Sequence, residues 1–406
     1  MPQASARAAT MPASPIRKLV PYADQAKREG AKVYHLNIGQ PDLPTPEGFL
    51  QAIVQQAPRV IEYSHSAGFE SLRRKTARFY ERYGIMGLTE NDILVTTGGS
   101  EALRFALMTC LNPGDEVLIP EPFYANYNGF AVEAGVEVKP LPTRIEDGFA
   151  LPSPEVFARH IGPRTKAIMI CNPSNPTGKL YPLEELQALA QIVQAHDLFL
   201  IADEVYRDFC YDGETFTSAL TFPEIAQNVL MVDSVSKRFS ACGVRIGVLV
   251  TRNKALVQGA MKFAQARLSP PTLGQIGTEA LLDLPDAYYA DIIAQYAARR
   301  DLVWQRLNAL PGVLCPRVSG AFYLMARLPL ADTDHFCQWL LEHHRHNGAT
   351  VMLAPGSGFY ATPGRGKDEV RLAYVLEPTA LNAALDCLET GLKAYQQQFA
   401  PAAVQA

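Results

Sequence analysis

The chain has 406 residues, of which 48% are hydrophobic and 19% are charged, and its formal net charge is -4. This balance is typical of a soluble globular protein, and the length favours two lobes over one core. The small negative charge argues against a general affinity for nucleic acid or for anionic membrane surfaces.

The first residues, MPQASARAATMPASP, contain no long apolar run. We therefore expect no secretory signal here, but a flexible tail over residues 1–14, with translation starting at Met1 or Met11. No stretch approaches the roughly 20 apolar residues that cross a bilayer. The seven cysteines are scattered and form no CxxC pair, which predicts reduced thiols, a cytoplasmic location and no metal cluster.

Short apolar runs alternate with helical stretches between about Pro46 and Leu284. Strands are predicted at Ile93–Thr97, Glu116–Ile119, Lys166–Cys171, Phe199–Asp203, Val229–Asp233 and Ile246–Val250. Helices are expected between them, such as Ser100–Leu111 and Pro182–His196. This alternation is typical of a mainly parallel sheet covered on both faces, so we predict a large α/β domain over residues 48–285.

The pattern changes after residue 285 and predicts a smaller α+β domain over residues 286–400. The expected helices are Ala287–Leu310, Asp334–His346 and Pro378–Gln398, and the expected strands are Ser319–Arg327, Thr350–Leu353 and Val370–Tyr374. We expect residues 15–47 to pack with this domain, which would then contain both chain ends.

The segment DSVSKRFSACGVRIG at 233–247 follows a predicted strand and holds the most informative lysine. Lys237 lies among small and hydroxyl residues, three positions after Ser234 and eight before Arg245. A lysine amine forms an imine with an aldehyde cofactor, and a hydroxyl with a guanidinium suits a phosphate. On this segment alone, a solvated surface lysine explains the pattern equally well.

Other motifs also fall just after predicted strands, where ligands bind in parallel sheets. The string VTTGGSEAL at 95–103 forms a glycine turn into a helix, and the backbone amides of Gly99 and Ser100 are expected to face an anion there. Further strings are PEPFYANY at 120–127, NPSNPTG at 172–178 and ADEVY at 202–206. Taken singly, each is also compatible with a turn, a helix cap or core packing.

Together, these strings resemble the class I and II aminotransferases of pyridoxal 5'-phosphate (PLP) fold type I, from about Ile38 to Tyr374. The resemblance implies PLP as the cofactor, a large sheet domain and a smaller α+β domain. Lys237 would be the Schiff-base lysine and the proton carrier. The cofactor phosphate would be bound by Gly99, Ser100, Ser234 and Arg245.

The resemblance also implies how the cofactor ring is held. Asp203 would pair with the protonated pyridine nitrogen, which makes the ring a better electron sink. Tyr206 and Asn175 would hydrogen-bond its phenolic oxygen, and Tyr124 would stack on its face. Tyr63 would reach the phosphate of the neighbouring subunit, which implies a homodimer with shared active sites.

On the substrate side, Arg371 matches the arginine that binds the α-carboxylate through its planar fork. Gly39 matches the glycine whose backbone lies beside the substrate, and Asn175 belongs to the same substrate-binding set.

Substrate choice remains open at the level of sequence. Relatives that act on aspartate read its distal carboxylate with a cation, at positions where this chain has Ser100 and, by alignment, Ala264. Arg267 and His65 are the possible substitutes. The donor is therefore aspartate or a neutral or aromatic amino acid, and 2-oxoglutarate is the expected acceptor.

The reaction implied by the resemblance is a ping-pong transamination. A C–S lyase or a cyclising synthase on the same fold would carry most of these motifs. A non-catalytic PLP-fold regulator is a remote alternative, because about 35 residues precede the first motif. A dinucleotide enzyme is disfavoured because no GxGxxG follows the first strand.

Overall fold

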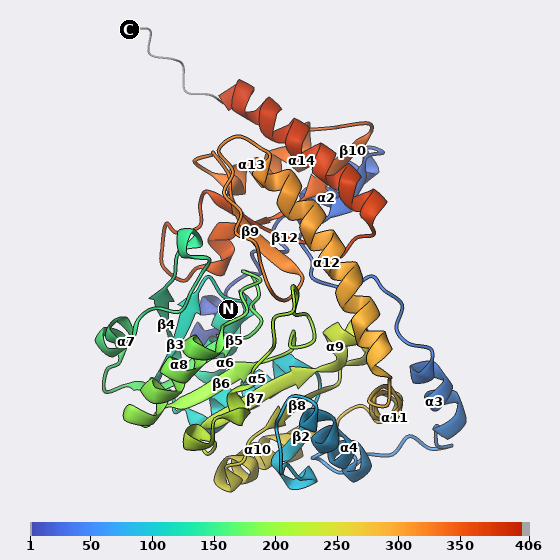
Figure 1. The fold of residues 1–406 in the computed structure, drawn as a ribbon, viewed down its shortest axis with the longest axis vertical. Coiled ribbons are helices and arrows are strands. Elements are labelled where there is room, and N and C mark those ends of the chain that lie inside the picture. The colour runs from blue at the N-terminus through green and yellow to red at the C-terminus, as the bar shows by residue number, and fades with distance from the viewer. Residues whose placement is uncertain (1, 400–406) are drawn as a thin grey trace.

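The computed structural model describes residues 2–399 and shows a large lobe built on a seven-stranded sheet, with a smaller lobe packed beside it (Figure 1). The sheet order is β2-β8-β7-β6-β5-β3-β4. Its strands are β2 (Ile93–Thr96), β3 (Glu116–Glu121), β4 (Glu137–Pro142), β5 (Thr165–Cys171), β6 (Phe199–Asp203), β7 (Val229–Ser234) and β8 (Gly247–Val250). Within it β8 runs antiparallel to both neighbours and the other pairs are parallel, so the predicted α/β fold with a mainly parallel sheet is confirmed.

Both faces of the sheet are buried, because alternate residues of each strand enter different cores. In β5, Ala167 and Met169 belong to one core and Ile168 and Ile170 to the other. The helices of this lobe are α3 (Gly48–Gln56), α4 (Glu70–Glu81), α5 (Gly99–Cys110), α6 (Asn126–Ala134), α7 (Pro154–His160), α8 (Leu183–Ala195), α9 (Val235–Arg238), α10 (Lys254–Arg267) and α11 (Thr272–Leu281). Core residues place α5, α6 and α10 on the first face and α4, α7, α8 and α11 on the second.

The smaller lobe combines segments from both chain ends. In it β1 (Lys32–His35) pairs with β10 (Ala349–Met352), and β12 (Glu369–Ala373) lies between β9 (Tyr323–Arg327) and β11 (Ala354–Pro355). Its helices are α2 (Val20–Arg28), α12 (Asp286–Asn308), α13 (Thr333–His343) and α14 (Pro378–Phe399). The long α12 runs from the large sheet to this lobe (Figure 1). We keep, as a proposal, the predicted division of the chain into tail, N-terminal segment, large domain and small domain, with boundaries at residues 14/15, 47/48 and 285/286.

Several strands differ from the sequence-based expectations. Strands β1, β4 and β11 were not expected, and the two prolines of β4 are tolerated because it lies at the sheet edge. The strand expected from Ser319 begins only at Tyr323, because the backbone of Ser319 and Ala321 bonds to Tyr211 and Phe209 and Ala321 takes φ +54°.

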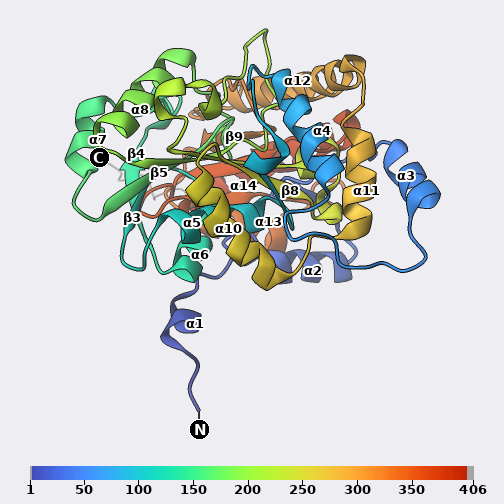
Figure 2. The ribbon, with the colours of Figure 1, turned by 90° about the horizontal axis from the view of Figure 1, so that it is seen from below.

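The N-terminal segment contains a short helix, α1 (Ala6–Thr10), that buries no residue and extends away from both lobes (Figure 2). The tail was expected to begin at Met1 and the smaller domain to end at residue 400. Both of these residues lie outside the described residues. Among residues 2–399, no helix combines the length and the apolar character needed to cross a membrane.

Candidate active site

A cavity of about 370 Å³ lies at the carboxyl ends of the sheet strands, between the two lobes and the N-terminal segment. Eleven of the twelve residues predicted from the sequence line it: Gly39, Gly99, Ser100, Tyr124, Asn175, Asp203, Tyr206, Ser234, Lys237, Arg245 and Arg371. The twelfth, Tyr63, is 79% exposed and lies outside it. The topology explains this gathering, since the turns after parallel strands meet at one edge of the sheet.

Lys237 enters the cavity from α9, the single helical turn that follows β7. Its Nζ donates a hydrogen bond to the carbonyl oxygen of Gly39 at 3.0 Å. Burial lowers the pKa of this amine, which favours the neutral, nucleophilic form. The next residue, Arg238, anchors the turn through a buried ion pair with Asp233 at 2.6 Å. The amine is therefore held by a rigid turn.

A second part of the cavity is suited to an anion. Gly98, with φ +77°, ends the turn before α5, so that the α5 N-terminus begins at Gly99. A Cβ on Gly98 would come within 2.3 Å of Nη2 of Arg245, so only glycine leaves room for that guanidinium. Ser234 lies beside it in the cavity wall and shares a hydrogen bond of 2.8 Å with the hydroxyl of Ser236. Helix amides, a guanidinium and hydroxyls are the donors that proteins use to bind phosphate groups.

Asp203 is the last residue of β6 and its carboxylate is buried. Its Oδ2 accepts a hydrogen bond from the hydroxyl of Tyr127 at 2.7 Å, and it forms no ion pair with any residue from 2 to 399. Burial raises the pKa of Asp203 to about 6, although the Tyr127 hydrogen bond opposes the shift. A cationic group placed beside this carboxyl would stabilise its ionised form.

Arg371 projects from the middle of β12 and is almost fully buried. Its guanidinium lies over the rings of Tyr323 and Phe359, each 4.7 Å away, and its Nη1 donates to Oδ1 of Asn175 at 3.0 Å. Nη2 donates to the Asn37 carbonyl, whereas Nε has no hydrogen-bond partner in the described part of the chain. A buried guanidinium without a carboxylate partner is ready to bind an anion.

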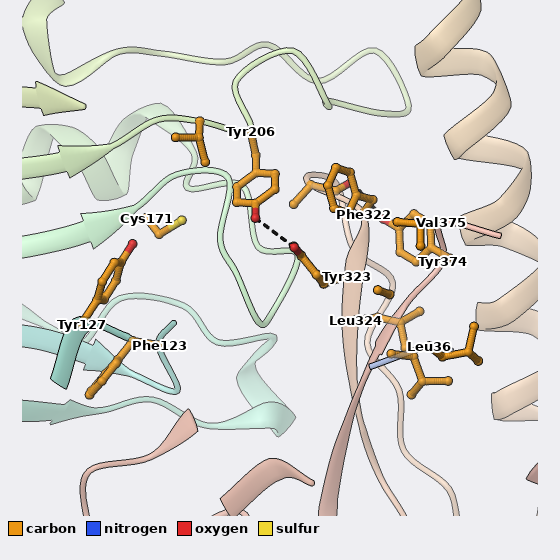
Figure 3. Packing of buried hydrophobic residues seen from close by; sticks show 14 of the residues in the cluster. Leu36, Phe123, Tyr127, Cys171, Tyr206, Phe322, Tyr323, Leu324, Tyr374 and Val375 are labelled. Atoms are coloured by element: carbon orange, nitrogen blue, oxygen red, sulfur yellow. Dashed lines mark hydrogen bonds between the residues drawn. The ribbon is translucent and has the colours of Figure 1, made fainter. Parts of the chain in front are cut away.

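Two tyrosine hydroxyls meet next to this arginine. Tyr206 and Tyr323 share a hydrogen bond of 2.9 Å, drawn as the dashed line in Figure 3. A Cβ on Gly39 would overlap the Tyr323 hydroxyl at 1.6 Å, which explains the glycine at that position. On the other side of the cavity Tyr124 packs edge-on against Tyr127, with ring centroids 5.5 Å apart.

The two proposed substitutes for a distal-carboxylate cation are engaged elsewhere. Arg267 donates to the carbonyls of Ser66 and Val95 and pairs with Glu101, and His65 accepts from the amide of Ala67. Neither side chain lines the cavity. Of the two positions expected to hold such a cation, Ser100 lines the cavity and Ala264 is buried in α10.

Sequence reasoning missed several lining residues: Arg17, Asn37, Tyr127, Ser236, Cys242 and Tyr323. Ser236 could have been found, since it immediately precedes Lys237. Tyr127 and Cys242 also lie inside the strings at 120–127 and 233–247. Arg17, Asn37 and Tyr323 lie outside the quoted strings, and their place depends on contacts between distant parts of the chain.

The donor set fits PLP. The cavity offers an amine with a lowered pKa at Lys237, a buried carboxylate without a cation at Asp203 and a phosphate-binding turn at Gly98. These match the cofactor's aldehyde, pyridine nitrogen and phosphate respectively.

Comparison with known proteins shows that the chain is similar to aminotransferases. The family model described as aminotransferase class I and II matches residues 31–387. An aspartate/prephenate aminotransferase of Thermus thermophilus is 36% identical over 371 residues, covering 89% of this chain and 91% of its own length. An aspartate aminotransferase of Musicola paradisiaca is 31% identical over 379 residues, covering 91% of each chain.

Solved structures are similar over nearly the whole chain. An aspartate aminotransferase from Thermus thermophilus with maleate superposes with a TM-score of 0.86 at 32% identity, covering 96% of this chain and 100% of the other. An alanine aminotransferase from Pyrococcus furiosus gives a TM-score of 0.88 at 29% identity, covering 97% and 100%.

Proposed function

The chain belongs to the aminotransferase class I and II family, and from this membership we propose how cofactor, substrates and subunits are arranged around the cavity. It is a PLP-dependent transaminase that moves an amino group from an amino acid to a 2-oxo acid in a ping-pong sequence. The residue roles, the subunit arrangement and the location that follow are proposals.

The cofactor phosphate is held by Arg245, Ser234 and the amides of Gly99 and Ser100. This assignment is supported by the glycine turn that leaves room for the guanidinium. Asp203 pairs with the pyridine nitrogen, and Tyr127 orients that carboxylate through its hydrogen bond.

The cofactor's other side is held by side chains that line the same cavity. Tyr124 stacks on the ring, and Tyr206 and Asn175 bond the phenolic oxygen.

Two basic side chains, Arg371 and Lys237, carry the substrate chemistry. The fork of Arg371 binds the α-carboxylate, and its contacts with Asn175 and the aromatic rings hold it in place for that bond. Bound PLP supplies an electron sink for the charge left at the substrate Cα. The neutral Nζ of Lys237 takes the Cα proton and later returns a proton, a role supported by its lowered pKa.

The donor is aspartate or a neutral or aromatic amino acid, and the acceptor is 2-oxoglutarate. Similar proteins are named for aspartate, prephenate and alanine, so their names alone do not select one donor for this chain.

The enzyme is a homodimer in which Tyr63 completes the partner's site. In support, Tyr63 lies in a segment of exposed apolar side chains that begins in α3, where Leu50 is 65% exposed and Val54 84%. Val60 and Ile61 continue it, and α3 lies at the periphery of the molecule in both views (Figures 1 and 2). A run of exposed apolar residues of this kind is typical of a surface that another subunit covers.

We place the enzyme in the cytoplasm, because all seven cysteines are free thiols in the structure.

One observation carries the proposal: Lys237, Asp203 and Arg371 face a single cavity from three different strands or turns. The test is the visible spectrum of the PLP-loaded protein, recorded before and after adding single amino acids without an oxo acid. The cofactor band should fall with particular donors and return when 2-oxoglutarate is added. Release of ammonia and pyruvate without an acceptor would identify a lyase, and failure to retain PLP would refute the proposal.

A further inference from the structure

Arg17 is a cation in the cavity wall that the roles above leave unused. It lies in the turn before α2, where its N–H donates to the Ser14 carbonyl at 3.1 Å and its carbonyl accepts from Val20 at 3.0 Å. Burial raises the pKa of the Tyr124 phenol, while the charges of Arg371 and Arg17 oppose that shift. Arg17 lines the same cavity as Tyr124 and Arg371.

The neighbours of Arg17 attach this turn to the small lobe. Pro15 packs so closely on Gly358 that a Cβ on that glycine would come within 2.3 Å of it. Lys18 forms an ion pair with Asp334 of α13. Arg17 is thus held at the cavity by its neighbours on both sides, while its own side chain stays exposed and forms no ion pair among residues 2–399.

Among the charged residues that line the cavity, Arg17 has no assigned anionic partner. The lining contains the three arginines Arg17, Arg245 and Arg371, one lysine, Lys237, and one carboxylate, Asp203. The proposed roles give Arg245 a phosphate, Arg371 an α-carboxylate and Lys237 the proton transfer. Arg17 therefore faces the cavity without an anion to bind.

The chemistry of the reaction requires such an anion. A ping-pong transaminase binds donor and acceptor in the same site, and 2-oxoglutarate carries a second carboxylate. A guanidinium that faces this carboxylate binds it through charge-assisted hydrogen bonds. Because Arg267 and His65 are turned away, Arg17 is the cavity-lining arginine that remains for it.

We propose that Arg17 binds the side-chain carboxylate of dicarboxylic substrates, which makes aspartate or glutamate the preferred donor and 2-oxoglutarate the acceptor. This inference rests on the proposed function. The planar guanidinium fork suits a carboxylate and selects against neutral side chains, which leave it unpaired. Specificity is thereby supplied by the N-terminal segment.

The test compares wild type with Arg17→Gln, Arg17→Lys and the control Lys27→Gln, which removes an exposed cation of α2 outside the cavity. For each, kcat/KM is measured in the half-reaction with aspartate, glutamate and alanine. Arg17→Gln should lower the ratio of the dicarboxylic donors to alanine by about tenfold to a hundredfold. Arg17→Lys should lower it less, since the charge remains, and Lys27→Gln should keep it within about twofold.

A binding measurement provides a readout that is independent of turnover. Calorimetric titration of the PLP-loaded protein with maleate, and with acetate as the monocarboxylate, should show that Arg17→Gln weakens maleate selectively. A ratio and a maleate affinity that are unchanged in Arg17→Gln would overturn the inference, as would an equal loss in Lys27→Gln. If wild type converts no amino acid, the proposed function fails, while maleate binding still decides the role of Arg17.

Discussion

Lys237 and Asp203 face the same cavity, and burial shifts their pKa values in opposite directions. It lowers the pKa of the Lys237 amine and raises the pKa of the Asp203 carboxyl to about 6. Both shifts favour the uncharged forms. A protonated pyridine nitrogen beside Asp203 would favour the carboxylate again, so that cofactor binding and the charge of this residue are linked.

Replacing Lys237 by alanine should abolish transamination and leave the fold intact. In the proposed mechanism this side chain supplies the amine that moves the proton, so the rate should fall by about a thousandfold or more. Steady-state turnover and circular dichroism measure the two effects. The exposed Lys262→Ala is the matched control. Turnover near that of wild type in Lys237→Ala would refute the assignment.

Asp203→Asn should stabilise the cofactor-free protein at neutral pH while it impairs catalysis. Because the pKa rises from 3.8 to about 6 on folding, the folded chain binds this proton more tightly than the unfolded chain. That stabilisation is complete below about pH 4 and is lost as the pH rises through about 6, a difference of about 1–3 kcal/mol. Asparagine avoids the loss and still accepts the Tyr127 hydrogen bond.

Denaturant unfolding at about pH 4 and pH 8 measures this effect. The advantage of Asp203→Asn should appear at the higher pH and vanish at the lower one. The exposed Asp147→Asn serves as the control and should show no such pH dependence. An advantage of equal size at both pH values would contradict titration of the buried carboxyl as the cause.

At the scale of elements, two glycines bring β8 and the start of α5 together. A Cβ on Gly247 would lie 2.6 Å from the carbonyl carbon of Gly98, and one on Gly98 would meet Arg245. The Cβ on Gly247 would also lie 2.9 Å from the carbonyl oxygen of Asp233 in β7. The turn before α5 therefore depends on the close approach of three backbone segments, namely this turn, β7 and β8.

Gly98→Ala should weaken PLP binding by about tenfold to a hundredfold, with a modest cost in stability. The new methyl group displaces the mobile end of Arg245, while the positive φ costs about 1–2 kcal/mol. Gly87→Ala is a matched control, since Gly87 has φ +72° and open space around it. PLP affinities are measured by fluorescence titration. If the two variants bind PLP equally well, displacement of Arg245 is not the cause of weaker PLP binding.

At the scale of the whole molecule, the site draws on both lobes and the N-terminal segment. Gly39 comes from the N-terminal segment, Lys237 from the large lobe and Arg371 from the small one, and β1 pairs with β10 across the length of the chain. The exposed segment from Leu50 to Tyr63 adds, as proposed, a second subunit.

Mixing Lys237→Ala with Tyr63→Ala should restore activity. In a mixed dimer one site receives an intact Lys237 from one subunit and an intact Tyr63 from the other. Random exchange should therefore give about a quarter of the wild-type number of complete sites. The assay is turnover and PLP affinity after the two proteins are unfolded and refolded together.

Val54→Asp should lower the apparent mass in analytical ultracentrifugation, because it puts a charge on the exposed apolar surface of α3. The control is Leu183→Asp, which changes an exposed leucine on α8. A mixture without restored activity, together with a Val54→Asp protein of unchanged mass, would argue against the shared site.

The sequence by itself determined six of the seven strands of the large sheet, all but β4, and the motifs that follow them. The predicted Phe199–Asp203 is the observed β6, and the strand before Lys237 differs from β7 by one residue. Apolar runs between glycine and proline turns are local signals, so they survive without knowledge of the fold. The motifs after these strands gathered at one edge because parallel strands place their carboxyl ends together.

Only the tertiary structure decided which side chains complete the cavity. The hydrogen bond from Tyr127 to Asp203 joins residues 76 positions apart, and that from Arg371 to Asn175 spans 196 positions. It also turned Arg267 and His65 away from the cavity and brought Arg17 to it. Contacts of this kind arise from the packing of separate elements, and no periodicity along the chain encodes them.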